Sequence, residues 1–153
     1  MNQKTARTKS RPRPKIRRDK KHLRRIVILD DEPDVKRAYE IVLPHILGHP
    51  SRLKIVTFTD GDKAARKLSR SNPDLFITDQ RHPGMKCDEI FEILARRKAN
   101  YPVFVISAGA SASRKRELLK LSRTHGLTIK VLPKPFSIDD LRRVLARYFH
   151  LCK

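Results

Sequence analysis

Cysteine, acidic residues and long apolar runs are all scarce in this sequence of 153 residues. The two cysteines, Cys87 and Cys152, form no CxxC pair, which excludes a disulfide framework and favours reduced thiols in a cytoplasmic protein. No apolar run approaches the roughly 20 residues that cross a bilayer. No apolar segment follows the basic N-terminus either, so we expect neither membrane insertion nor a secretory signal.

Acidic residues number 16 against 36 lysines and arginines, and the resulting charge of +20 is concentrated at the N-terminus. Residues 1–25 hold 12 basic residues and a single acid, Asp19. Because such a segment cannot offset its ordering entropy by burial, we expect a disordered basic tail over residues 1–24 and one folded domain over 25–153. The tail suits nonspecific binding of nucleic acid or of an acidic partner, and a solvated extension without a partner is the alternative.

Short apolar runs alternate with helical patterns through the rest of the chain. The pattern predicts an α/β domain with a parallel sheet and helices on both faces. Pro44 is expected to end or kink the first helix, and the last helix is expected to carry its apolar face from Ile138 to Phe149. Gly126 is predicted to end the fourth helix and Ser137 to cap the fifth. Strands are predicted at 26–29, 53–58, 75–78, 103–106 and 128–132.

Charged and hydroxyl side chains follow four of the predicted strands, namely Asp30 with Asp31, Asp79, Ser107 and Lys134. The carboxyl ends of parallel strands meet at one edge of a sheet, so these residues should share a crevice. Three carboxylates together need a cation, and Mg²⁺ prefers hard oxygen ligands. An isolated strand-end aspartate is usually solvated or caps a helix, but the whole set in order favours a functional site.

Asp79 is the candidate nucleophile. A carboxylate with a pKa near ~3.9 is ionised at neutral pH and needs no general base. It would attack a phosphoryl group, whose charge would be met by Mg²⁺, the Lys134 ammonium, the Ser107 hydroxyl and the backbone N–H groups of Arg81 and Ala108. A phosphatase of the haloacid dehalogenase type would need a second aspartate where Arg81 stands, so that alternative is poor.

The chain resembles the receiver domain of bacterial two-component response regulators from Arg25 to Phe149. The motifs that carry the resemblance are Ile26–Pro33 with Asp30 and Asp31, Asp60–Gly61, Asp74–Asp79 with Pro83–Met85, Val105–Ala108 and Lys134–Phe136. The resemblance implies a flavodoxin-like (βα)5 doubly wound sheet with strand order 2-1-3-4-5. It also implies a regulatory protein rather than an enzyme.

In function, the resemblance implies Mg²⁺-dependent transfer of a phosphoryl group from a histidine kinase or phosphotransfer protein to Asp79, with a downstream protein target. The implied metal ligands are Asp30, Asp31, Asp79 and the backbone carbonyl of Arg81. The implied phosphoryl-binding residues are Ser107, Ala108 and Lys134. The alternative is a nucleic-acid-associated basic protein with a degenerate receiver fold. The sequence as given ends soon after the last predicted helix, so we expect no output module.

Several positions depart from the family pattern. The switch positions are Ser107 and Val131, and the family usually has an aromatic residue where Val131 stands. Arg81 lies beside the expected path of the hydrolytic water, so we predict that it slows loss of the phosphoryl group. Cys87 replaces a common glycine and is expected to start a helix, whereas His82 is expected to be a surface residue rather than a metal ligand.

Overall fold

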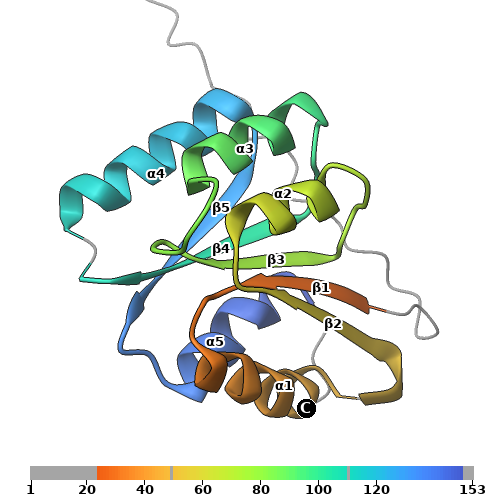
Figure 1. Ribbon diagram of the computed structural model, residues 1–153. Helices are drawn as coiled ribbons and strands as arrows, with labels where there is room; N and C mark the ends of the chain where they lie inside the picture. Colours follow the sequence, from red (N-terminus) through yellow and green to blue (C-terminus); the bar gives the residue numbers. More distant parts are fainter. Residues whose placement is uncertain (1–23, 49, 110, 150–153) are drawn as a thin grey trace, which may run out of the picture.

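The structure is a computed structural model that describes residues 24–48, 50–109 and 111–149. Strands and helices alternate strictly within these residues (Figure 1). The strands are β1 (Arg24–Leu29), β2 (Leu53–Phe58), β3 (Leu75–Asp79), β4 (Pro102–Ala108) and β5 (Thr128–Lys134). The helices are α1 (Pro33–Leu47), α2 (Gly61–Leu68), α3 (Cys87–Arg96), α4 (Ala112–His125) and α5 (Ile138–Ala146), with the short 3-10 helix η1 (Pro50–Arg52) before β2.

The five strands form one parallel sheet in the order β2-β1-β3-β4-β5. This order confirms the predicted flavodoxin-like topology. Residues 1–23 of the expected basic tail lie outside the described residues. Arg24, which we had assigned to the tail, is the first residue of β1.

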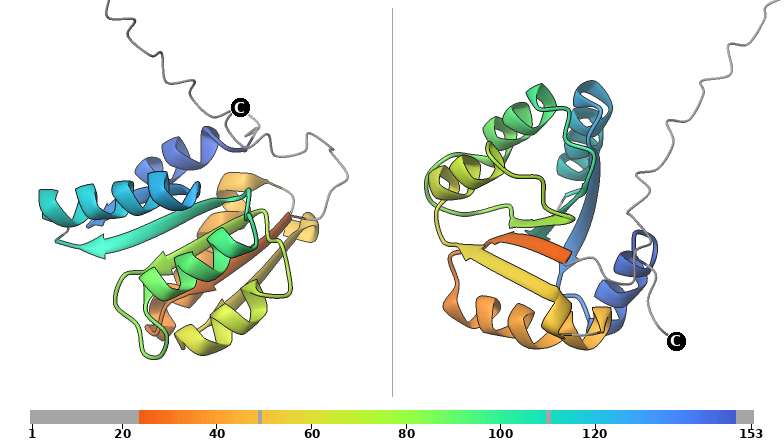
Figure 2. Two further views of the ribbon diagram at one scale, coloured as in Figure 1. Left: turned by 90° about the horizontal axis from the view of Figure 1, so that it is seen from above. Right: turned by 90° about the vertical axis from the view of Figure 1, so that its right-hand side faces the viewer.

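Helices cover both faces of the sheet, as Figures 1 and 2 show, with α1 and α5 on one face and α2, α3 and α4 on the other. Each face therefore has its own apolar core, one containing Leu43 and Leu145 and the other Leu68, Phe91 and Leu118. The central strands β1, β3 and β4 are buried on both faces, which accounts for their continuous apolar sequences. None of the described helices is long and apolar enough to cross a membrane.

Helix ends follow the local sequence at most positions. Gly126 adopts the left-handed conformation (φ 67°) that ends α4, as predicted. Ser137 caps α5 through a reciprocal pair of hydrogen bonds with Asp140, also as predicted.

Two helix boundaries differ from the prediction. Helix α1 passes through Pro44 and continues to Leu47, because Leu43, Ile46 and Leu47 are all buried in the core. Helix α5 stops at Ala146, so the buried Phe149 packs from beyond the helix rather than from its face. In both places tertiary packing determines where the helix ends.

Candidate functional site

The register of the sheet brings the strand-end residues together. Leu29 of β1 pairs with Thr78 of β3, so Asp30 and Asp79 are the next residues along two neighbouring strands. Ala108 of β4 pairs with Lys134 of β5 at the same edge. The crevice expected from the sequence is therefore present at the carboxyl ends of β1, β3, β4 and β5.

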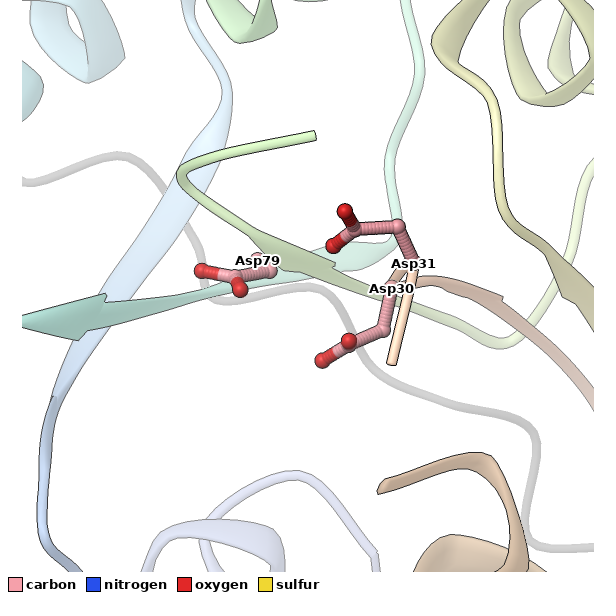
Figure 3. A group of neighbouring side chains, drawn as sticks. All are labelled: Asp30, Asp31 and Asp79. Atoms are coloured by element: carbon pink, nitrogen blue, oxygen red, sulfur yellow. The ribbon is translucent and has the colours of Figure 1, made fainter. Parts of the chain in front are cut away.

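Asp30, Asp31 and Asp79 form a carboxylate cluster at the ends of β1 and β3 (Figure 3). An oxygen from each of the three carboxylates lies within 4.8 Å of the other two. Asp30 is 1% exposed and Asp79 is 8% exposed, whereas Asp31 is open to solvent. Two buried like charges at this separation are unfavourable unless a cation or a proton compensates them.

Asp30 carries the clearest sign of an absent partner. Its Oδ1 accepts a hydrogen bond from the Glu32 backbone N–H at 3.0 Å, but its buried Oδ2 has no hydrogen-bond partner. Burial raises the pKa of the Asp30 carboxyl above its ordinary value, and the charge on Asp79 acts in the same direction. An unsatisfied buried oxygen within an all-carboxylate cluster fits a hard divalent cation such as Mg²⁺.

Asp79 is also held by donors on its other side. Lys134 Nζ lies 3.4 Å from Asp79 Oδ2, and the Arg81 backbone N–H donates to Asp79 Oδ1 at 3.4 Å. The Lys134 side chain is 27% exposed and the Asp79 side chain 10% exposed, so the pair sits at the mouth of the site rather than in the core. The lysine therefore lies where an anion approaching Asp79 would meet it.

A cleft of about 500 Å³ opens over Asp79. The Ser107 hydroxyl in its wall donates to Gln80 Oε1 at 2.5 Å and is buried. Ala108 is exposed beside it. The lining residues are Asp31, Glu32, Asp79, Gln80, Arg81, Ser107, Ala108, Gly109, Ser111, Arg114 and Lys134.

The loop after Asp79 is braced by the start of α2. The Gly61 backbone N–H donates to the Pro83 carbonyl at 2.8 Å. A Cβ on Gly61 would lie only 2.2 Å from the Met85 carbonyl oxygen, so no other residue fits there without a shift of the backbone. Gly84 has φ +77° and packs against the carboxylates of Asp60 and Asp62. The Asp60–Gly61 motif thus has a structural role in shaping the acceptor loop.

Cys87 and His82 anchor the same loop from beneath. Cys87 begins α3, as predicted, and its Sγ lies 3.6 Å from the Asp79 carbonyl oxygen and 3.4 Å from His82 Nε2. Burial raises the pKa of the Cys87 thiol to about 11, so it stays protonated at neutral pH. The prediction that His82 is a surface residue is wrong, because its side chain is folded under the loop against Cys87 and only 7% of the residue is exposed.

The two predicted switch positions lie in different surroundings. Ser107 faces the cleft, whereas Val131 of β5 is buried in the core beside Leu118 and Ile129. Receiver domains usually have at this position an aromatic side chain that moves on phosphorylation, and the valine at residue 131 has no such ring.

Sequence reasoning missed five residues of the cleft wall: Glu32, Gln80, Gly109, Ser111 and Arg114. Glu32 and Gln80 directly follow predicted site residues, so their position in the chain was an available signal. Arg114 gave no such signal, because only the packing of α4 against α3 brings it to the cleft.

Comparison with known proteins agrees with this geometry. Residues 26–146 match the response regulator receiver domain family. The response regulator protein PilR of Pseudomonas aeruginosa is 31% identical over 127 residues, which cover 82% of this chain and 26% of that protein. The transcriptional regulatory protein KdpE of Mycobacterium tuberculosis is 30% identical over 115 residues, covering 75% of this chain and 46% of that protein. The chain thus spans less than half the length of these relatives.

Solved structures share the fold. The signal receiver domain of a LuxO repressor protein from Vibrio parahaemolyticus superposes with a TM-score of 0.67 at 20% identity, covering 81% of this chain and 88% of that one. The receiver domain of the sensor histidine kinase PA1611 from Pseudomonas aeruginosa gives 0.63 at 23% identity, covering 82% and 96%, and is described with a magnesium ion coordinated in its active site cleft. The family match over most of the chain and the shared topology lead to one conclusion: this chain belongs to the response regulator receiver domain family.

Proposed function

We propose that the protein accepts a phosphoryl group on the carboxylate of Asp79 and works as a regulatory switch. The observation that carries the proposal is that Asp79 lies in a carboxylate cluster with Asp30 and Asp31 and also contacts Lys134, whose Nζ lies 3.4 Å from Asp79 Oδ2. The metal is proposed to be Mg²⁺, bound by Asp30, Asp31, Asp79 and the backbone carbonyl of Arg81. The unsatisfied Oδ2 of Asp30 supports this assignment.

In the proposed reaction an Asp79 oxygen attacks the phosphorus of a phosphohistidine. The new P–O bond forms as the P–N bond breaks, and the leaving imidazole nitrogen keeps the electron pair of that bond. Lys134 and the backbone N–H groups of Arg81 and Ala108 receive the phosphoryl oxygens, and the Ser107 hydroxyl can turn from Gln80 toward them. A bound magnesium ion would neutralise part of the developing charge.

Acetyl phosphate tests the proposal directly, because it needs no partner protein. With Mg²⁺ present, intact-mass spectrometry should detect one added phosphoryl group on the wild-type chain and none on Asp79→Asn. Asp139→Asn is the matched control, since Asp139 is an exposed carboxylate outside the acidic cluster and the cleft, and it should be labelled like wild type. Equal labelling of wild type and Asp79→Asn would contradict the proposal.

A nucleic-acid-associated protein with a degenerate receiver fold is the less supported alternative. A degenerate site would be expected to lose one of its charged groups, yet the three carboxylates and the lysine are all in place around one cleft. Absence of any phosphoprotein with acetyl phosphate and Mg²⁺ would favour this alternative. The basic tail, on which nucleic-acid binding would rest, lies outside the described residues.

The partners belong to the same proposal. A histidine kinase or a phosphotransfer protein would supply the phosphoryl group, and a downstream protein would receive the signal. On this proposal the chain itself is not an enzyme, and a cytoplasmic location accords with its reduced buried thiol. Protein capture with the unmodified and the phosphorylated chain, compared side by side, would identify the target by its preference for one form.

A further inference from the structure

Arg114 reaches the phosphoacceptor cleft from an unexpected direction. It lies in the first turn of α4, and its backbone N–H donates to the capping side chain of Ser111 at 3.2 Å. Its side chain lines the same cleft of about 500 Å³ as Asp79, Ser107 and Lys134. The wall of the cleft therefore includes an arginine of α4, an element separate from the acceptor loop.

The guanidinium is presently held by two carboxylates. Its NH1 lies 2.7 Å from Glu117 Oε2, and its NH2 lies 3.4 Å from Asp88 Oδ1. The side chains of Asp88 and Glu117 are 47% and 54% exposed, and ion pairs with such exposed groups contribute little to stability. The Nε atom of Arg114 is buried and has no hydrogen-bond partner at all. The guanidinium is thus weakly held and incompletely satisfied.

Phosphorylation of Asp79 would change the balance of charge in the cleft. A phosphoryl group carries roughly −1.5 to −2 charge at neutral pH and presents three strong acceptor oxygens. Guanidinium and phosphoryl groups match as a fork, with two parallel N–H···O bonds that are stronger than those between neutral groups. A phosphoryl group on Asp79 would therefore compete with Glu117 and Asp88 for Arg114.

We propose that Arg114 is a further phosphoryl ligand. On phosphorylation its guanidinium would break its ion pairs with Glu117 and Asp88 and bind the aspartyl phosphate, and this change would carry the signal into α4. The proposal rests on phosphorylation of Asp79. It supplies a readout that does not depend on residue 131, which is a buried valine rather than an aromatic residue. Arg81 cannot carry the same signal, since it belongs to the acceptor loop itself.

Beryllofluoride with Mg²⁺, a stable mimic of the phosphoryl group on aspartate, tests the proposal on the full chain. In the wild type it should protect the amides at the start of α4 against hydrogen exchange. In Arg114→Gln the affinity for beryllofluoride should fall on the order of tenfold, and the protection of α4 should be lost even at saturation. Arg116→Gln is the matched control, because Arg116 is exposed on the same helix and does not line the cleft.

The variant Glu117→Gln gives a change of opposite sign, which a merely structural role of Arg114 would not produce. Removing the competing carboxylate should tighten beryllofluoride binding about twofold to fivefold. An unchanged α4 response in Arg114→Gln, or weaker binding in Glu117→Gln, would overturn the inference while leaving the function of Asp79 intact. Fluorine NMR detects beryllofluoride binding directly. If the wild type does not bind it, the proposed function and this inference are overturned together.

Discussion

The two sides of the cleft are built from different kinds of structure. The acceptor side consists of Asp31, Asp79 and Lys134 together with the neighbouring buried Asp30, and the α4 side consists of Arg114 and its two carboxylate partners. Asp30 and Asp79 are short, buried side chains at the ends of central strands. Arg114 is long, 25% exposed, and held by half-exposed carboxylates.

On the proposals above, the rigid acceptor side would carry out the phosphorylation and the more loosely held α4 side would transmit it. A carboxylate cluster fixed by parallel strands is preorganised, because its backbone is held by the sheet on both sides. The α4 side is held by weak surface ion pairs, and such contacts are the ones that a new charge can rearrange. The acceptor-side residues stand in the motifs on which the resemblance rests, whereas Arg114 belongs to none of those motifs.

The acceptor side should fail most severely when its cation is removed. In Lys134→Ala we expect the rate of labelling by acetyl phosphate to fall on the order of 100-fold, because the positioned charge that meets the phosphoryl oxygens is lost. Lys130→Ala, on the same strand but outside the cleft, should react like wild type. Time-resolved mass spectrometry measures both rates. Equal rates in the two variants would place the important charge elsewhere.

Placing an aromatic residue at position 131, in the core beside Leu118 of α4, should not restore an aromatic switch. Val131→Phe adds volume to a packed core, so the free energy of unfolding should fall by about 1–3 kcal/mol, measured by urea denaturation. Val131→Ala is the companion variant, because it leaves a cavity in the same place and should also be less stable than wild type. A Val131→Phe protein as stable as wild type would show that this core accommodates the larger ring.

The acidic cluster should cost stability when no metal is bound. Without Mg²⁺ at neutral pH, Asp30→Asn should be more stable than wild type, with a free energy of unfolding higher by about 1 kcal/mol. The substitution removes a buried negative charge that lies beside the carboxylates of Asp31 and Asp79. The folded-state pKa of Asp30 is raised, so the wild type loses stability as pH rises through that pKa. The difference in free energy of unfolding between Asp30→Asn and wild type should therefore increase with pH.

Magnesium should reverse this order. In thermal denaturation, Mg²⁺ should raise the midpoint temperature of the wild type and leave that of Asp30→Asn nearly unchanged. A ligand stabilises only the state that binds it. Equal stabilisation of both proteins by Mg²⁺ would mean that Asp30 is not a ligand. Asp139→Asn is the matched control, because Asp139 is exposed and lies outside the acidic cluster and the cleft; Mg²⁺ should stabilise it as much as wild type.

The smallest effect is expected at Arg81, which borders the cleft on the acceptor loop. In Arg81→Ala the aspartyl phosphate should lose its phosphoryl group a few-fold faster, because its hydrolytic water is less crowded and one exposed charge contact, worth about 0–1 kcal/mol, is removed. Arg70→Ala, an exposed arginine outside the cleft, should leave the half-life unchanged. An unchanged or longer half-life in Arg81→Ala would contradict the prediction.

The sequence predicted the acceptor side well for a physical reason. In a parallel sheet every strand ends at the same edge, so the alternation of apolar runs already brings Asp30, Asp79 and Lys134 together. The order of the strands followed from the resemblance, whereas their register was supplied by the structure.

The remainder could not be predicted because it depends on packing between distant segments. Arg114 and Asp88 are 26 residues apart and meet only because α4 lies against α3. His82 has a polar side chain, and its burial is determined by the Cys87 thiol beneath the loop. Helix α1 passes through Pro44 because buried residues beyond the proline outweigh the hydrogen bond that it removes.

The Cys87 thiol beneath the acceptor loop offers a natural reporter of motion there. It is 4% exposed, so an alkylating reagent can reach it only when the loop opens away from α3. In a chain whose second cysteine is replaced, Cys152→Ser, the alkylation rate becomes a measure of how often the phosphorylation site opens. The alkylation rate of Cys87 would thus report directly on motion of the loop that follows Asp79.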